Sequence, residues 1–235
     1  KLMNTIVTRL FFFSTALFLT PIPLRLQAKL LGNIAVFFYC FNSYYRRICR
    51  INISRCFPQK SEQEIERLCK KIFYSMGVGI AEALSTWQMS NERFNRIKVY
   101  PHGIENLELL QAKNKGVIIY TSHFSSIELI GRKMFGLCGA KVMYKKYSNS
   151  TFDQYVLRRR ERYVDCIEKS NIKKTLSSLK KGATLAYLPD QNVPDRNRSS
   201  FIFESFFDIP CAISCGVKRL PEIPGALPIF CYYYR

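Results

Sequence analysis

Several kinds of functional site are missing from this sequence. Only two histidines occur in 235 residues, and the nine cysteines include no Cys-x-x-Cys pair, so a zinc site is not expected. No Gly-x-Ser-x-Gly motif marks a hydrolase nucleophile, and no zinc finger or aromatic-basic RNA-binding signature is found. Internal repeats and low-complexity linkers are also lacking. These absences argue against a metalloenzyme, a serine hydrolase and a nucleic-acid-binding module.

Acidic residues are scarce as well. The chain has 17 Asp and Glu against 36 Lys and Arg, which gives a net charge of +19. Such a surplus indicates an anionic partner: nucleic acid, phospholipid headgroups or an acidic protein. Because the chain also opens with an apolar segment, a membrane surface is favoured. With 48% hydrophobic and 23% charged residues, the chain is neither disordered nor a multi-span membrane protein.

The cysteines are odd in number and scattered along the chain. An oxidising compartment usually imposes an even disulfide framework. We therefore expect reduced, mostly buried thiols on the cytoplasmic side of a membrane.

The N-terminal segment, residues 1–48, is apolar and basic. Residues 10–20 form an apolar run of eleven residues after Arg9, whereas a membrane span needs about 20. Two prolines follow, and then a second apolar-aromatic stretch at 30–45 that is flanked by arginines. We expect an uncleaved membrane anchor whose second element lies against the interface, with its arginines on anionic headgroups. A cleaved signal peptide and two buried core helices are the alternatives.

The following segment, residues 49–98, has a helical pattern. Ser61-Glu62-Gln63-Glu64 is typical of a capping box, and apolar residues recur after it at helical spacing. Nothing in this stripe suggests chemistry.

From residue 99 to residue 235 the pattern changes to α/β. Val117 to Tyr120 follow Gly116 as a β-branched apolar run, which is typical of a strand buried on both faces. Further strands are expected at 141–144 and 183–188. Helices are expected at 152–167, which is rich in arginine, and after Asn171 up to Gly182. The predicted fold class is α/β, with a mainly parallel central sheet flanked by helices and preceded by the N-terminal hydrophobic anchor segment.

Polar side chains follow three of the expected strands. His123 comes after the first strand, Lys145 after the second and Asp190 after the third. Because parallel strands end at one edge of a sheet, these residues should gather on the rim where open α/β sheets bind ligands.

His123 is followed five positions later by Glu128, after a tight turn. A carboxylate beside a histidine fixes its tautomer and stabilises the imidazolium, as a general base requires. The alternative is that Glu128 caps a helix that begins near Ser125 and that His123 is an ordinary loop residue. The spacing by itself does not decide between the two.

Several further motifs occur in order along the chain. They are Asn52 with Cys56-Phe57-Pro58, the block 116–128, the run 149–162, Leu179-Lys180-Lys181-Gly182, Pro189-Asp190-Gln191, and Phe201-x-Phe203-x-x-Phe206-Phe207. This set resembles the lipid A biosynthesis acyltransferases, the bacterial lauroyl and myristoyl transferases, within the glycerolipid and lysophospholipid acyltransferase superfamily. The resemblance runs from about Asn52 to the last residues. Ser122 before the histidine, and Glu128 in place of Asp, favour the lipid A branch.

The resemblance implies transfer of a fatty acyl chain from an acyl carrier protein or coenzyme A thioester to a hydroxyl of a lipid A precursor, without a further cofactor or metal. His123 would take the hydroxyl proton, and Glu128 would orient the ring and stabilise the imidazolium. A lysophospholipid or glycerolipid acceptor is the alternative within the enzyme class. Outside it, the alternative is a non-catalytic basic protein that binds an anionic membrane surface. An esterase with Ser125 or Ser126 as nucleophile would need the hydrolase elbow that is missing.

The resemblance also gives candidate substrate-binding residues. Arg160 matches an arginine of the family's second motif, and its planar guanidinium suits an oxyanion or a phosphate. Arg162, Lys145 and Asn149 are further candidates, and Asp190 would hold Lys145 or the arginines, or cap a turn. The alternative is a solvated arginine face for acidic carrier protein or lipid. The phenylalanines of residues 201–207 would line an acyl-chain groove or form a core strand.

The sequence departs from the family pattern near its end. Asn192 and Pro194 stand where Asp and Gly are usual, and Asp208 stands where a Gly follows the phenylalanine pair. The chain also stops inside what resembles another strand, so we expect a C-terminal truncation. The implied location is the cytoplasmic face of the bacterial inner membrane, with acyl carrier protein and anionic lipid as partners and no nucleic acid.

Overall fold

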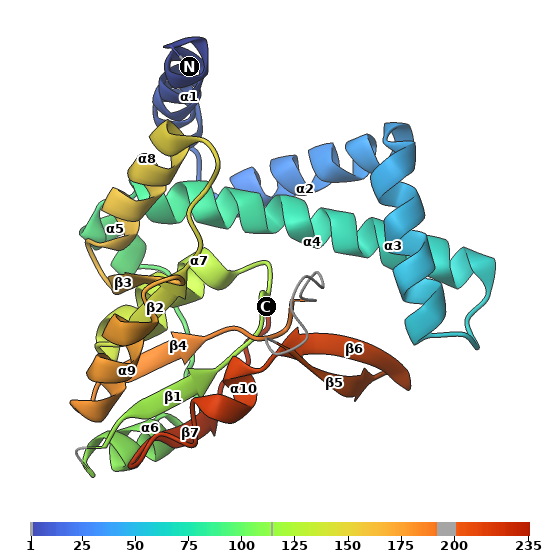
Figure 1. Ribbon diagram of the computed structural model, residues 1–235. Helices are drawn as coiled ribbons and strands as arrows, with labels where there is room; N and C mark the ends of the chain where they lie inside the picture. The colour runs from blue at the N-terminus through green and yellow to red at the C-terminus, as the bar shows by residue number, and fades with distance from the viewer. Residues whose placement is uncertain (1, 114, 192–200) are drawn as a thin grey trace. The chain divides into compact units, whose positions relative to one another are not determined.

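The computed structural model describes residues 2–113, 115–191 and 201–235, which fold as two compact units (Figure 1). The first unit comprises the residues up to Phe11, Ser90–Phe124 and Leu129–Arg235. The second comprises Phe12–Met89 and Ser125–Glu128.

The second unit is mostly helical, and the first unit combines strands with its own helices. The helical segments are α1 (Leu2–Ser14), the π-helical η1 (Thr15–Leu19), α2 (Leu24–Phe41), α3 (Ser43–Cys56), α4 (Glu62–Gln88), α5 (Asn91–Asn95), α6 (Ile104–Gln111), α7 (Ile127–Ile130), the π-helical η2 (Gly131–Phe135), α8 (Ser150–Arg160), α9 (Ile172–Lys180) and α10 (Gly216–Arg219). The strands are β1 (Val117–Tyr120), β2 (Lys141–Tyr144), β3 (Asp165–Glu168), β4 (Thr184–Tyr187), β5 (Phe201–Phe206), β6 (Ile209–Ser214) and β7 (Leu227–Phe230).

The first unit is built on a parallel sheet of five strands in the order β3-β2-β4-β1-β7 (Figure 1). Strand β1 lies between β4 and β7, with Tyr120 paired in register with Tyr187 and with Phe230. The predicted α/β class with a mainly parallel sheet is therefore confirmed, as are the strands expected at 117–120, 141–144 and 183–188.

Both faces of the sheet are covered, as the β-branched run predicted. On one face, Val117 and Ile119 pack with Leu107 of α6 and Phe135 of η2. On the other face, Ile118 packs with Leu185 of β4, Leu179 of α9 and the segment after α10. Apolar burial on both faces fixes the register of β1, because a shift by one residue would exchange the two sets.

The helix expected at 152–167 is wrong in its second half. Helix α8 ends at Arg160, and residues 165–168 form β3, which pairs in parallel with β2. The side chains of Cys166 and Ile167 are buried. Two apolar residues after an arginine run are too few to show the hydrophobic periodicity of a strand or of a helix, so the sequence alone could not distinguish the two.

Strands β5 and β6 form a separate antiparallel hairpin. Phe203 and Phe206 are 67% and 60% exposed, so the alternative of a core strand for the phenylalanine motif is wrong. The turn residues Phe207 and Asp208 have φ values of 51° and 58°, in the left-handed region that favours glycine. This conformation explains why a glycine is usual at position 208. The other two departures, at 192 and 194, lie outside the described residues.

In the second unit, α2 runs alongside α4 (Figure 1), and glycines allow the close approach. A Cβ at Gly77 would lie 2.2 Å from the carbonyl oxygen of Leu31. Helix α4 begins with the predicted capping box, in which Ser61 and Glu64 exchange hydrogen bonds.

No helix in the described part of the chain combines the length and the apolar character needed to cross a membrane. The anchor expected within residues 1–48 is therefore unsupported. All nine cysteines are free thiols, but only Cys69 and Cys166 are buried, so the expectation of mostly buried thiols is wrong.

The α2–α4 contact can be tested with Gly77→Ala. The added methyl group must push backbone away, and we expect a loss of about 1–3 kcal/mol in unfolding free energy despite the better helix propensity of alanine. Trp87 is the only tryptophan, so its fluorescence during urea denaturation reports on the second unit. Lys71→Ala, at an exposed position of the same helix, is the control. Equal stability of the two variants would contradict the close packing.

The β5–β6 turn can be tested with Asp208→Gly. Glycine adopts the positive φ of 58° without a Cβ clash. We expect the free energy of unfolding to rise by about 0.5–1 kcal/mol, after allowance for the greater entropy of glycine in the unfolded chain. Thermal denaturation followed by circular dichroism measures the change. Asp208→Ala, which keeps a Cβ in the same conformation, should lower the melting temperature instead.

Candidate active site

Two neighbouring parallel strands bring His123 and Asp190 together. The last residues of β1 and β4, Tyr120 and Tyr187, are paired in register, and the Thr121 amide extends the pairing by donating to the Tyr187 carbonyl at 3.1 Å. His123 and Asp190 each follow three residues after those strand ends. The two loops thus leave the same edge of the sheet side by side, on the rim that the sequence predicted.

The Asp190 carboxylate holds His123 through both of its oxygens. The His123 backbone N–H donates to Oδ2 at 2.9 Å, and the ring Nδ1 lies 2.6 Å from Oδ1. Since an ionised carboxylate can only accept, Nδ1 is the donor, and the neutral ring has its lone pair on Nε2. The two side chains are 39% and 34% exposed, so solvent and substrate can reach the pair. From the sequence we expected Asp190 to hold Lys145 or the arginines, or to cap a turn. In the structure its partner is His123.

Aromatic contacts hold the loop around His123. The Tyr233 hydroxyl donates to the carbonyl oxygen of Ser122 at 3.5 Å, and its ring packs edge-on against Phe124 with centroids 4.7 Å apart. Tyr233 lies in a run of three tyrosines that carries no motif, so sequence reasoning missed it.

Glu128 belongs to the second unit, where Trp87 of α4 positions it. The indole Nε1–H of Trp87 donates to the Glu128 Oε2 at 2.9 Å, and Trp87 itself is buried. Ser125 lies against the same helix: its hydroxyl is 3.1 Å from that of Ser75, and a Cβ at Gly79 would lie 2.4 Å from its carbonyl oxygen. Helix α7 begins at Ile127, two residues later than expected. The pairing of Glu128 with His123 stays a prediction.

Asn149 caps helix α8 and connects it to α1. Its Oδ1 accepts from the backbone N–H groups of Thr151 and Phe152 at 3.0 and 3.1 Å, which caps α8, and its Nδ2 donates to the Thr8 hydroxyl at 3.0 Å. Asn149 therefore links the first turn of α8 to α1 within the first unit, and this contact explains its place before the arginine helix.

The basic candidates differ in their surroundings. Arg160 is partly buried in the last turn of α8 and donates from Nη2 to the Tyr147 hydroxyl at 3.5 Å. Lys145 and Arg162 are exposed. Lys146, beside Lys145, pairs with Glu168 at 2.7 Å, and this ion pair lowers the pKa of Glu168 and raises that of Lys146.

A further arginine, Arg132 of η2, was not recognised from the sequence. Its guanidinium lies over the Phe94 ring at 3.9 Å from the centroid and donates to Asn91 Oδ1 at 2.7 Å. Burial lowers its pKa, and the nearby positive charge of Arg162 lowers it further. This arginine holds α5 against η2.

Among the described residues, no group of three His, Cys, Asp or Glu side chains converges as a set of metal ligands. A histidine held by a carboxylate can accept a proton at its other ring nitrogen.

Comparison with known proteins identifies related sequences. The family of bacterial lipid A biosynthesis acyltransferases matches residues 3–233, well beyond the start at Asn52 that the motifs indicated. The lipid A biosynthesis palmitoleoyltransferase of Escherichia coli K12 is 32% identical over 182 residues, which are 76% of this chain and 58% of that protein.

Two further relatives from the same bacterium agree. The lipid A biosynthesis lauroyltransferase is 28% identical over 88% of this chain and 65% of its own length. The lipid A biosynthesis myristoyltransferase is 26% identical over 90% of this chain and 66% of its own length. The chain thus spans less than two thirds of each of these relatives, but the family match covers nearly all of its own residues. The chain belongs to the bacterial lipid A biosynthesis acyltransferase family.

Proposed function

We propose that this chain carries the catalytic centre of an acyltransferase that moves a fatty acyl group from a thioester to a hydroxyl of a lipid A precursor. The observation that carries the proposal is the contact of Asp190 with both the backbone and the ring of His123. It leaves Nε2 as the proton acceptor at the open rim of a parallel sheet.

In the proposed reaction, His123 acts as general base. Nε2 takes the proton of the acceptor hydroxyl while the hydroxyl oxygen attacks the thioester carbonyl. The tetrahedral intermediate then collapses, the carbon–sulfur bond breaks, and the imidazolium returns the proton to the leaving thiolate. General-base catalysis typically contributes roughly 100- to 10,000-fold in rate. The Asp190 carboxylate, 2.6 Å from Nδ1, stabilises the imidazolium formed on the way.

Glu128 is the second carboxylate in the proposal. We infer that it supports His123 as the resemblance implies, with one of its oxygens held by the Trp87 indole. A carboxylate held in place by a buried donor is pre-organised, so it need not reorganise when charge develops.

Arg160 is proposed as a contact for the oxyanion or a substrate phosphate. Its position is supported by the Tyr147 hydroxyl and by the rigid last turn of α8. Arg162 and Lys145, both exposed, are proposed to attract an acidic donor or a phosphorylated acceptor. Asn149 is proposed to support the site through the cap of α8.

The proposed donor is an acyl carrier protein or coenzyme A thioester, and the proposed place of reaction is the cytoplasmic face of the inner membrane. Three relatives are named lipid A biosynthesis acyltransferases with palmitoleoyl, lauroyl and myristoyl groups, which supports a long-chain acyl donor. The net charge of +19 favours both an acidic carrier protein and an anionic lipid surface.

The role of Asp190 can be tested by NMR of the two histidine rings. In the wild type, nitrogen-15 shifts of His123 in its neutral form should show a proton on Nδ1. Asp190→Ala removes the acceptor, and we expect a mixture of tautomers, while His102 remains unchanged as an internal control. If Glu128→Gln and not Asp190→Ala abolishes the single tautomer, the ring is oriented by Glu128.

The role of His123 can be tested by turnover of an acyl carrier protein thioester with a tetra-acyl lipid A precursor. His123→Ala should lower the rate at least about a hundredfold, because the proton acceptor is lost. His102→Ala, which changes the other, exposed histidine, should retain the wild-type rate.

Three outcomes would contradict the proposal. Equal turnover by wild type and His123→Ala would refute the assigned base, and absence of turnover in the wild type with intact membrane binding would favour a non-catalytic basic protein. If a lysophospholipid is acylated faster than the lipid A precursor when both compete, the acceptor is the lysophospholipid and not the lipid A precursor.

A further inference from the structure

The second unit is strongly asymmetric in charge. From Phe12, where it begins, to Ser61 it contains no Asp or Glu. The same stretch contains seven basic residues: Arg25, Lys29, Arg46, Arg47, Arg50, Arg55 and Lys60. Four of them lie on one helix, α3. A cationic surface of this kind needs anionic partners, from the protein itself or from outside.

Helix α3 is packed on one side and open on another. Cys49 and Ile53 pack against the cluster of Tyr39, Ile65 and Cys69 from α2 and α4. Another side lines a shallow hollow, and its residues follow one another at helical spacing: Ser43, Arg46, Arg47, Arg50, Ile51, Ser54 and Arg55. None of the described residues that line this hollow is acidic.

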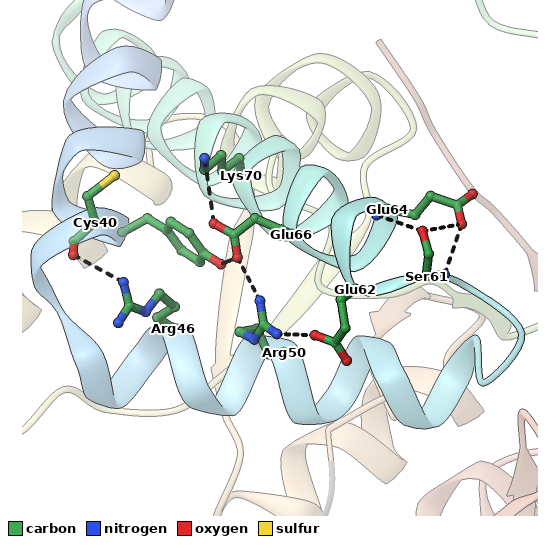
Figure 2. Close-up of polar contacts among 9 residues, drawn as sticks. Cys40, Arg46, Arg50, Ser61, Glu62, Glu64, Glu66 and Lys70 are labelled. Atoms are coloured by element: carbon green, nitrogen blue, oxygen red, sulfur yellow. Dashed lines mark hydrogen bonds and ion pairs between the residues drawn. The ribbon is translucent and has the colours of Figure 1, made fainter.

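Arg50 of this hollow forms ion pairs with protein carboxylates. It forms ion pairs with Glu62 and, at 2.8 Å, with Glu66, both at the start of α4 (Figure 2). Glu66 also accepts from the Tyr39 hydroxyl at 2.7 Å, and these donors lower its pKa. Arg50 therefore joins α3 to α4 and has a structural role.

Arg46, Arg47 and Arg55 differ from Arg50 in this respect. Arg46 donates to the carbonyl oxygen of Cys40 at 3.3 Å, a neutral partner (Figure 2). Within the described part of the chain no carboxylate forms an ion pair with any of these three arginines, and Arg47 and Arg55 are exposed. Three guanidinium groups along one helix repel one another, and bound phosphates would offset this repulsion.

Large apolar side chains are exposed beside these arginines. Phe41, at the end of α2, is 73% exposed, and Tyr44, at the start of α3, is 67% exposed. The complete set in these two helical stretches is Phe37, Phe38, Phe41, Tyr44, Tyr45, Ile48 and Ile51. Aromatic and aliphatic groups next to arginines suit a membrane interface, where rings lie at the headgroup level and guanidinium groups contact phosphate. Nucleic acid would meet the charge but not this apolar area, whereas an anionic bilayer meets both.

We propose that α3 and the last turn of α2 form a docking surface for an anionic lipid bilayer. Arg46, Arg47 and Arg55 bind headgroup phosphates, and the exposed aromatic residues enter the boundary between headgroups and acyl chains. This surface specifies the membrane contact of the proposed function, but it does not depend on the proposed reaction, since binding requires neither donor nor acceptor.

The test is sedimentation of the full chain with vesicles of phosphatidylcholine, with and without phosphatidylglycerol. The wild type should bind the anionic vesicles far better than the neutral ones, and added salt should weaken this preference. The triple variant Arg46→Gln, Arg47→Gln, Arg55→Gln should partition about a hundredfold less onto anionic vesicles. The triple variant with lysine at these positions should retain most of the binding, because it keeps the charge.

A matched control removes the same charge elsewhere. Arg67→Gln, Arg96→Gln and Lys180→Gln together change three exposed basic residues outside α3, and this variant should bind nearly as the wild type does. Unchanged Trp87 fluorescence verifies that the α3 variants fold.

Three results would overturn the proposal. They are wild-type binding by the α3 glutamine variant, an equal loss in the control variant, and α3-dependent binding to duplex DNA that is tighter than binding to vesicles. His123→Ala should bind vesicles as the wild type does, so failure of the docking surface and failure of the proposed catalysis are separately visible.

Discussion

The in-register parallel pairing of β1 with β4 is the constraint on which the candidate site depends. Tyr120 is paired with Tyr187, and three residues after each of them stand His123 and Asp190. Equal offsets from paired strand ends place the two side chains at the same height on the rim. The register is itself fixed by burial: Val117, Ile118 and Ile119 are buried between covering layers on both faces, so β1 cannot slide without exposing them.

Local patterns in the sequence predicted the elements that determine this geometry. The β-branched run after Gly116, the capping box at Ser61 and the asparagine cap of α9 all lie where their chemistry indicates. Each of these signals is contained in a few neighbouring residues, and burial of the predicted strand on both faces follows from its composition alone. The parallel direction of the strands was likewise expected, because strands alternate with helices along the chain.

Features that depend on distant residues could not be predicted in the same way. Asp190 was known as a motif residue, but its separation of 67 positions from His123 concealed their contact. Trp87 looked like part of an apolar stripe, although its indole N–H holds Glu128. The strand β3 was mistaken for helix because two buried residues after an arginine run give no period. In each case the deciding partner comes from another element.

One carboxylate that holds both the main chain and the ring of His123 has an evolutionary consequence. A glutamate at position 190 would be longer by one methylene group and could not meet both donors from the same backbone position, and an asparagine would present one acceptor and one donor to two N–H groups. The ring could meet an asparagine only by moving its proton to Nε2, which would remove the proposed proton acceptor. Descendants of this sequence that keep a histidine at 123 should therefore retain aspartate at 190, and the two positions should be lost together in any lineage that abandons the chemistry.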